Sequence, residues 1–187
     1  AKDRVGARAE LRDAFLYGRF KLGSLPGELR AGRQVINWGE STFIQGGINA
    51  INPIDVSALR VPGAELRDSL LPVGSGFLSR KPSENTALEV YYQYDWQETQ
   101  IDPVGSYFST TDLAGGGAEK VLLGFGSAPD TIPVGARIPG NPVGAVVPRG
   151  ATREADESDQ YGAAFRWFVP ALGGTDFGFY YMKYNSR

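Results

Sequence analysis

The sequence predicts an all-β protein, an antiparallel up-and-down transmembrane β-barrel of which these 187 residues supply about six strands. The main observation is that the connections between strand-like segments alternate between short and long. The tight turns span 22–27, 82–85 and 172–175, and the long connections span 41–72 and 100–157. Short turns at one end and large loops at the other are typical of outer-membrane barrels. Because such barrels have at least about eight strands, we expect residues 1–187 to be an internal part of one barrel domain.

The second observation is composition. The chain has no Cys and no His, 12% aromatic residues and a net charge of -2. The dispersed cations and the acidic pI of about 5.3 argue against nucleic acid as a partner. No run of about 18 apolar residues exists, so the sequence predicts no transmembrane helix, and a membrane protein would have to cross with strands.

The third observation is alternation with a period of two, which is clearest over 86–99. Between Leu88 and Gln97, apolar residues occupy the even positions and polar residues the odd ones, apart from the ambiguous Tyr91. Such a pattern predicts a strand with one apolar and one wet face. Aromatic residues of the apolar face are predicted to face lipid or the membrane interface, namely Tyr92, Tyr94 and Trp96.

The segment 160–169 repeats the alternation and continues it across the Gly173-Gly174 turn, which predicts a hairpin. Its predicted lipid-facing aromatic residues are Phe165, Trp167, Phe177 and Phe179. A short, glycine-containing strand over 73–81 is expected to pair with 86–99. The first strand changes phase near Arg12 or Asp13, where a bulge would explain the shift.

The partner of the first strand, 28–39, is too polar for both its faces to meet lipid, so one face should meet water or a polar lumen. Together with the polar face of 86–99, it predicts a lumen lined by Arg30, Arg33, Asn37, Gln93 and Asp95.

The connection 41–72 carries more apolar residues than a free loop needs, which predicts that it packs against the barrel wall or into the lumen and narrows the channel. The residues expected in this inward-folded constriction are Phe43, Asn49, Asn52, Asp55 and Arg60. If the chain is not a barrel, the same segment would be a small soluble subdomain. The connection 100–157 is predicted to be a long extracellular loop; its acidic end lacks the spacing of a calcium loop, and a solvated charge run is the simpler interpretation.

Catalysis is not expected. Without His, neither a Ser-His nucleophile nor a His-based metal site can form within these residues. The glycine-rich stretch 115–120 lacks the spacing of a phosphate-binding loop, and no metal or cofactor is predicted.

Several strings carry a family resemblance. They are Gly32-Arg33-Gln34-Val35-Ile36-Asn37-Trp38-Gly39-Glu40-Ser41, Gly46-Gly47-Ile48-Asn49, Ile51-Asn52-Pro53, Pro62-Gly63-Ala64-Glu65, Leu70-Leu71-Pro72, Tyr92-Gln93-Tyr94-Asp95-Trp96 and Tyr107-Phe108-Ser109-Thr110. Over nearly the whole chain, this set resembles the domain-of-unknown-function 1302 family of Gram-negative, proteobacterial outer-membrane β-barrel proteins. The resemblance implies a longer parent protein, periplasmic lipoprotein and inner-membrane export-pump partners, and traffic of hydrophobic molecules. It implies no catalytic residues.

Three functions are consistent with the sequence. The first is a barrel in the bacterial outer membrane, among its lipids, that passes or exports hydrophobic, lipid-like molecules. The second is a non-transporting outer-membrane scaffold or adhesin that binds a partner through 100–157. The third is a soluble β-sandwich binding domain.

Overall fold

A computed structural model describes residues 11–39, 47–109, 113–123, 129, 131–136 and 146–187. Its main feature is a six-stranded antiparallel sheet in the order β1-β2-β3-β4-β7-β8. The strands are β1 (Ala14–Leu22), β2 (Leu25–Gln34), β3 (Val73–Ser83), β4 (Thr86–Gln93), β7 (Gln160–Val169) and β8 (Thr175–Lys183). Sequential neighbours pair throughout, which gives a meander with no crossover.

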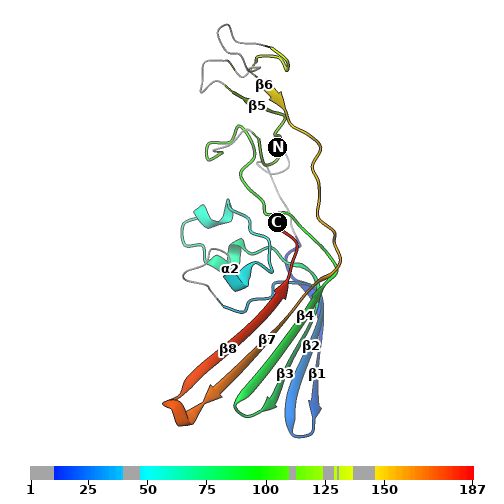
Figure 1. Cartoon of the computed structure of the whole chain (residues 1–187), viewed down its shortest axis with the longest axis vertical. Coiled ribbons are helices and arrows are strands. Elements are labelled where there is room, and N and C mark those ends of the chain that lie inside the picture. The colour runs from blue at the N-terminus through cyan, green and yellow to red at the C-terminus, as the bar shows by residue number, and fades with distance from the viewer. Residues whose placement is uncertain (1–10, 40–46, 110–112, 124–128, 130, 137–145) are drawn as a thin grey trace.

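Short hairpins and long connections lie at opposite ends of this sheet (Figure 1). The three tight turns join β1 to β2, β3 to β4 and β7 to β8, the last through the 3-10 turn η3 (Pro170–Leu172). The long connection before β3 holds η1 (Gly47–Asn49), η2 (Ala58–Arg60) and the short helix α2 (Leu66–Ser69). The connection before β7 holds a separate two-stranded sheet of β5 (Lys120–Leu122) and β6 (Val146–Pro148). Within the described residues the helices are short, and none of them could cross a membrane.

The predicted barrel is not closed in this structure. Among the described strands, β1 and β8 are the two edges of an open sheet. Six strands are fewer than the roughly eight that the smallest single-chain barrels need to bring their edges together. The antiparallel meander expected from the sequence is therefore present, and the closed barrel is not.

Some strand boundaries differ from the prediction. The segment expected to be one strand over 86–99 ends as β4 at Gln93, although the Tyr94 amide still donates to the Gly74 carbonyl at 3.1 Å. The strand expected over 28–39 is β2, which ends at Gln34; beyond it, Ile36 and Trp38 belong to the buried cluster on the polar face. The first strand begins at Ala14, after the change of phase, so no strand bulge forms at Arg12 or Asp13; residues 1–10 lie outside the described part.

The pairing register divides the sheet into two faces that differ in character. One face, called the apolar face below, carries Leu16, Phe20, Leu29, Ala31, Leu78, Leu88, Val90, Tyr92, Tyr161, Phe165, Trp167, Phe177, Phe179 and Tyr181. The other, called the polar face, carries Tyr17, Arg19, Glu28, Arg30, Gln34, Ser75, Phe77, Ser79, Glu89, Tyr91, Gln93, Gln160, Arg166 and Tyr180. The core of the molecule lies on the polar face, where the chain after β2 packs.

Candidate functional site

The candidate site is the polar face at the loop end of the sheet, together with residues 35–39 and 47–72, called the covering segment below, which pack on it. Apolar side chains from the segment, Ile36, Trp38 and Ile51, form one buried cluster with strand residues of the polar face. The Trp38 ring lies 5.2 Å from the ring of Tyr91 on β4 and 5.8 Å from that of Tyr180 on β8. The segment therefore spans the sheet from its middle strands toward its β8 edge.

The side chain of Asn52 joins the part of this segment that follows β2 to the part that precedes β3. The buried Asn52 side chain donates to the Ile36 carbonyl at 2.6 Å and accepts from the Ile36 amide at 3.2 Å. This reciprocal pairing imitates a strand neighbour, so it satisfies backbone groups that β2 no longer pairs. The Gln93 side chain then donates to the Ile51 carbonyl at 2.9 Å, which fixes the segment to β4.

Three glutamines on the polar face mark the loop end of the sheet, and each is fully buried: Gln34 on β2, Gln93 on β4 and Gln160 on β7. The guanidinium of Arg187 donates to the side-chain oxygens of Gln93 at 2.8 Å and Gln160 at 3.3 Å. Burial lowers the pKa of Arg187, while the nearby Tyr91 and Asp95 oppose that shift. Arginine keeps its proton under all ordinary conditions, so this row carries a permanent positive charge.

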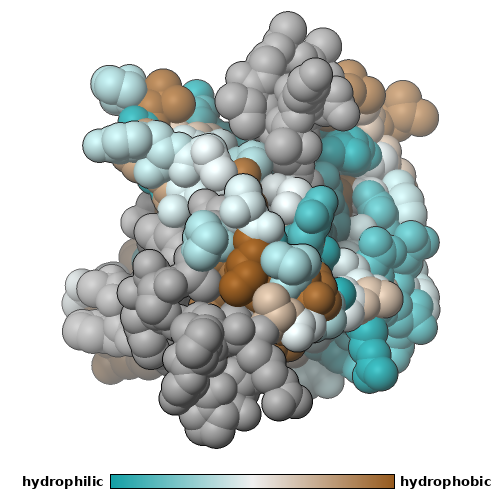
Figure 2. All heavy atoms as spheres, turned by 90° about the horizontal axis from the view of Figure 1, so that it is seen from above, coloured by the Kyte–Doolittle hydropathy of each residue, from teal (hydrophilic) through white to brown (hydrophobic). Residues whose placement is uncertain are grey.

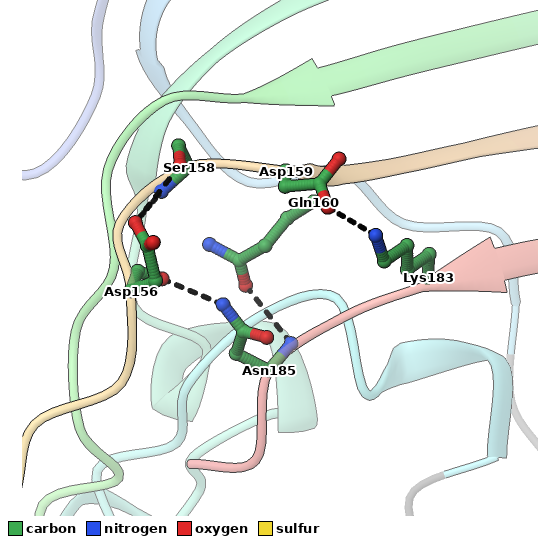
Figure 3. A network of polar contacts seen from close by, with 6 residues as sticks. All are labelled: Asp156, Ser158, Asp159, Gln160, Lys183 and Asn185. Atoms are coloured by element: carbon green, nitrogen blue, oxygen red, sulfur yellow. Dashed lines mark hydrogen bonds and ion pairs between the residues drawn. The ribbon is translucent and has the colours of Figure 1, made fainter.

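The entry to β7 and the exit from β8 are tied together beside this row (Figure 3). The Asn185 side chain donates to the Asp156 carbonyl at 2.6 Å, and the Asn185 amide donates to the Gln160 side chain at 3.3 Å. Lys183 pairs with Asp159 across the same two strands. Hydrogen bonds from the Ser158 amide and hydroxyl, at 3.0 and 2.8 Å, lower the pKa of the Asp156 carboxyl. The acidic end of the second connection is therefore a structural junction at the sheet.

The residues predicted to line a lumen do not all share one face. Arg30 and Gln93 lie on the polar face, where the Arg30 guanidinium stacks 4.3 Å over the Phe77 ring and pairs with Glu28 at 3.3 Å. Arg33 lies on the opposite face of the sheet from Arg30 and pairs in register with Gly74. Its guanidinium donates to the side chain of Gln97 at 3.4 Å.

The other two members of the predicted lumen set lie beyond the strand ends. Asp95 accepts a hydrogen bond from the Gly74 amide at 3.3 Å. Asn37 is exposed and accepts from the Gly39 amide at 2.8 Å. Neither is therefore part of the paired sheet.

Of the residues predicted in the constriction, Asn49, Asn52 and Asp55 are buried in the covering segment. Asp55 accepts hydrogen bonds from the Ser57 amide and hydroxyl at 3.0 and 2.5 Å. Arg60 pairs with Asp102 at 2.6 Å and links the covering segment to the second connection. Phe43 lies outside the described residues.

The predicted lipid-facing aromatic residues of the strands all lie on the apolar face and stay exposed: Tyr92, Phe165, Trp167, Phe177 and Phe179. Rings of β7 and β8 pair along that face, with centroids 6.3 Å apart for Phe165 and Phe179 and 6.0 Å apart for Trp167 and Phe177. Tyr94 and Trp96 follow the end of β4. Tyr94 is exposed, and the half-buried Trp96 indole donates to the Ser186 carbonyl at 3.1 Å.

Sequence reasoning missed several residues of the site, above all Trp38, Tyr91, Gln160 and Arg166. Tyr91 was detectable, since its odd position in an alternating strand assigns it to the polar face. Arg166 donates to the Trp38 carbonyl at 3.2 Å, across 128 residues of sequence, and no local pattern reveals such a contact. In the part of the chain that the structure describes, no three His, Cys, Asp or Glu side chains gather as a metal ion would require.

These features define a mostly β protein with a six-stranded antiparallel sheet, exposed on its apolar face and covered by its own chain at the loop end of its polar face. The chain belongs to the family described as protein of unknown function (DUF1302), whose family model matches residues 1–187, as the sequence strings indicated. Searches of the curated proteins and of the solved structures gave no match.

Proposed function

We propose that this chain is part of an outer-membrane β-barrel that passes or exports hydrophobic, lipid-like molecules. The observation that carries the membrane placement is the bare apolar face of the sheet. Exposed fractions reach 83% for Leu16 and 57% for Phe179, and no described segment covers this face. Soluble monomers rarely expose an apolar patch that spans a whole sheet, because burying apolar surface away from water is favourable. Lipid tails are the partner that fits it.

The distribution of aromatic residues along the apolar face supports the same placement. Tyr92, Tyr161 and Tyr181 lie toward the loop end, and Trp167 and Phe177 lie toward the hairpin end. Aromatic girdles at the two interfaces flank the apolar band of outer-membrane barrels. With this orientation the hairpins point to the periplasm and the long connections point outward.

The open edges of the sheet support a barrel made of more strands than these six. A strand edge presents unpaired amide and carbonyl groups, and each such group is costly in a hydrocarbon environment. In the proposed protein, further strands pair with β1 and β8 and close the wall. The polar face then lines the lumen, and the covering segment lies inside as a constriction.

The cargo and the partners follow from the family resemblance. They are hydrophobic molecules, a periplasmic lipoprotein and an inner-membrane export pump. The exposed part of the polar face offers both classes of contact that an amphiphilic cargo uses: the rings of Tyr17 and Tyr180 and the charge of Arg19. We assign no catalytic step to it.

A second candidate function, an outer-membrane scaffold or adhesin, is favoured by the connection 94–159. This connection carries its own sheet, β5-β6, away from the strands of the wall (Figure 1). Seen from above, hydrophilic residues cover much of the described surface, with a smaller hydrophobic group near the centre (Figure 2). Deleting 113–150 separates the two functions. Unchanged cargo flux with lost partner binding would favour adhesion, and reduced flux would favour transport gating.

Tryptophan quenching tests the membrane placement, because the chain has three tryptophans in three different settings. In single-tryptophan variants of the complete natural chain, reconstituted in bilayers of brominated phosphatidylcholine, Trp167 on the apolar face should be strongly quenched. Trp38, only 3% exposed on the polar face, is the matched control and should be quenched weakly. Trp96, beyond the end of β4, reports the interface. Equal, weak quenching of Trp38 and Trp167 would instead indicate a soluble β-domain.

A further inference from the structure

A cleft of about 600 Å³ lies at the loop end of the molecule, between the two ends of the second connection and the chain that follows β8. Its lining includes residues of 96–101 from the start of that connection, residues of 149–155 from its end, and residues 185–187. Residues 113–115 complete the lining. The cleft is therefore separate from the buried cluster around Trp38.

Hydrogen bonds hold the sides of this cleft in place. The Trp96 indole donates to the Ser186 carbonyl at 3.1 Å, which joins the chain after β4 to the chain after β8. The Asn185 side chain donates to the Asp156 carbonyl at 2.6 Å, which joins the chain before β7 to the same residues (Figure 3). Both ends of the second connection are thus fixed to one segment.

Arg187 is the most informative residue of the lining. Its guanidinium donates to the two glutamine side chains described above and to the Gln97 carbonyl at 3.3 Å, and all of these acceptors are neutral. No carboxylate among the described residues forms an ion pair with it. The nearby Asp95 accepts from the Gly74 amide instead. A partly buried charge without a counter-ion is costly, and an anion beside it would offset that cost.

The charges around the cleft favour an anion with one negative charge. Three arginines line it, Arg149, Arg153 and Arg187, together with two glutamates, Glu98 and Glu154. The lining therefore carries a net charge of about one positive unit at neutral pH. A carboxylate would balance this charge, and arginine is well suited to bind it. A doubly charged phosphate would exceed it and would be repelled by the glutamates.

The cleft also has an apolar side, formed by Trp96, Ile101 and Leu113. An alkyl chain that packs there is removed from water, which is favourable. A small anion such as acetate uses only the charge of the cleft, whereas an amphiphile uses the charge and the apolar side together.

We propose that this cleft binds an amphiphile with a single carboxylate head, placed beside Arg187, and an alkyl chain along Trp96, Ile101 and Leu113. The proposal deepens the proposed function by naming a class of cargo, and the role of the ligand as cargo rests on that function. In the proposed orientation the cleft lies at the outer end of the wall.

Quenching of Trp96 by a brominated fatty acid tests this proposal. A variant of the complete natural chain that keeps only Trp96, in non-ionic detergent micelles at mildly alkaline pH, is titrated with dibrominated stearate and with its methyl ester. Because the ester has the same chain and no charge, it should need about tenfold higher concentrations to quench Trp96. Equal quenching by the two probes would overturn the role of the charge.

Competition separates an amphiphile from a simple anion. Unbrominated stearate should displace the probe and restore Trp96 fluorescence, and acetate at the same concentration should not. Equal displacement by acetate would leave only an anion site. The matched control is the variant that keeps only Trp167, which lies outside the cleft and should respond equally to the acid and the ester.

Variants locate the binding at the arginines of the cleft. R187Q should weaken stearate binding by about tenfold, because it removes charged hydrogen-bond donors. R153Q, at an exposed position, should weaken it by about threefold. R67Q removes an exposed arginine outside the cleft and should leave the affinity unchanged. Equal effects of R187Q and R67Q would overturn the assignment.

R187K separates the loss of charge from a change in packing. It keeps the positive charge and should retain more binding than R187Q. If R187K lost as much binding as R187Q while R153Q lost none, charge would not hold the ligand and the proposal would fail.

This proposal and the membrane placement fail in different ways. Strong quenching of Trp167 by brominated phosphatidylcholine, with an equal response of Trp96 to stearate and its ester, would keep the membrane placement and remove this site. Weak quenching of Trp167 in bilayers, with selective quenching of Trp96 by stearate, would keep the site and remove the membrane placement.

Discussion

Tyr91 and Tyr92 are neighbours in β4 and differ completely in their surroundings. Tyr91 is 1% exposed on the polar face, under the ring of Trp38, whereas Tyr92 is 48% exposed on the apolar face. The peptide bond between them reverses the direction of the side chain, as in every strand. The same residue type therefore lies in a packed core at one position and on a bare surface at the next.

This difference shows what each face of the sheet packs against. At its loop end the polar face is covered by residues 35–39 and 47–72 of the chain, which supply Ile36, Trp38 and Ile51 to the core. The apolar face has no such cover among the described residues, although its side chains are the more hydrophobic ones. An inside-out arrangement of this kind is expected when the solvent around the sheet is lipid.

Truncation of the two tyrosines should give the largest contrast. Tyr91→Ala removes a fully buried ring and leaves a cavity beside Trp38, so it should lower the free energy of unfolding by about 3–5 kcal/mol. Tyr92→Ala should lower it by less than about 1 kcal/mol, because no cavity forms at an exposed position. Urea unfolding in detergent micelles measures both. Equal losses would mean that the apolar face is also packed against protein.

A charge placed on each face should sharpen the comparison. Val90→Arg puts a guanidinium in the middle of the apolar face. In the proposed membrane placement the charge would enter lipid, so the protein in bilayers should be destabilised by about 2–4 kcal/mol. The matched change on the polar face is Ser79→Arg, which pairs in register with Glu28 and Glu89. It should change stability by no more than about 0.5 kcal/mol. The check is unfolding in phospholipid vesicles, where a tolerated Val90→Arg would contradict the lipid-facing assignment.

Two glycine-to-alanine substitutions, one on each face, test how tightly that face is packed, because they add only a methyl group. A Cβ at Gly162, on the polar face, would lie 2.6 Å from the Tyr181 carbonyl oxygen and from Cε1 of Tyr91. Gly162→Ala should therefore destabilise by about 1–3 kcal/mol. Gly76, on the apolar face, has no atom within 4 Å of that position, and Gly76→Ala should stabilise by about 0.4–1 kcal/mol. Thermal unfolding measures both shifts, and a shared sign would remove the contrast between the faces.

The alternating segments were the most predictable part of the fold. The strand expected over 160–169 is β7, Gln160–Val169, with Phe165 and Trp167 on one face as the period of two indicates. The hairpins were also predictable, because glycine and polar residues between two alternating runs mark a turn. Side-chain direction and turn position are local properties, so they can be read without a neighbour.

The candidate site was predicted less well. Asn52 was expected to line a constriction, but its contact with Ile36 depends on how the chain folds back after β2. The end of β4 at Gln93 was missed because alternation continues to Gln97 while the pairing with β3 and β7 does not. Strand pairing is a contact between residues that are distant in the sequence, so the alternation of apolar and polar residues does not show where that pairing ends.

By itself, the sequence determined the class of structure: alternating strands, tight turns at one end, long connections at the other, and an aromatic face opposed to a polar one. The tertiary structure alone decided which segment covers the polar face, and that Trp38, Tyr91 and Arg166 meet there. The physical reason is that backbone geometry sets local direction along the chain, whereas a core forms between residues that only the complete arrangement of strands brings together.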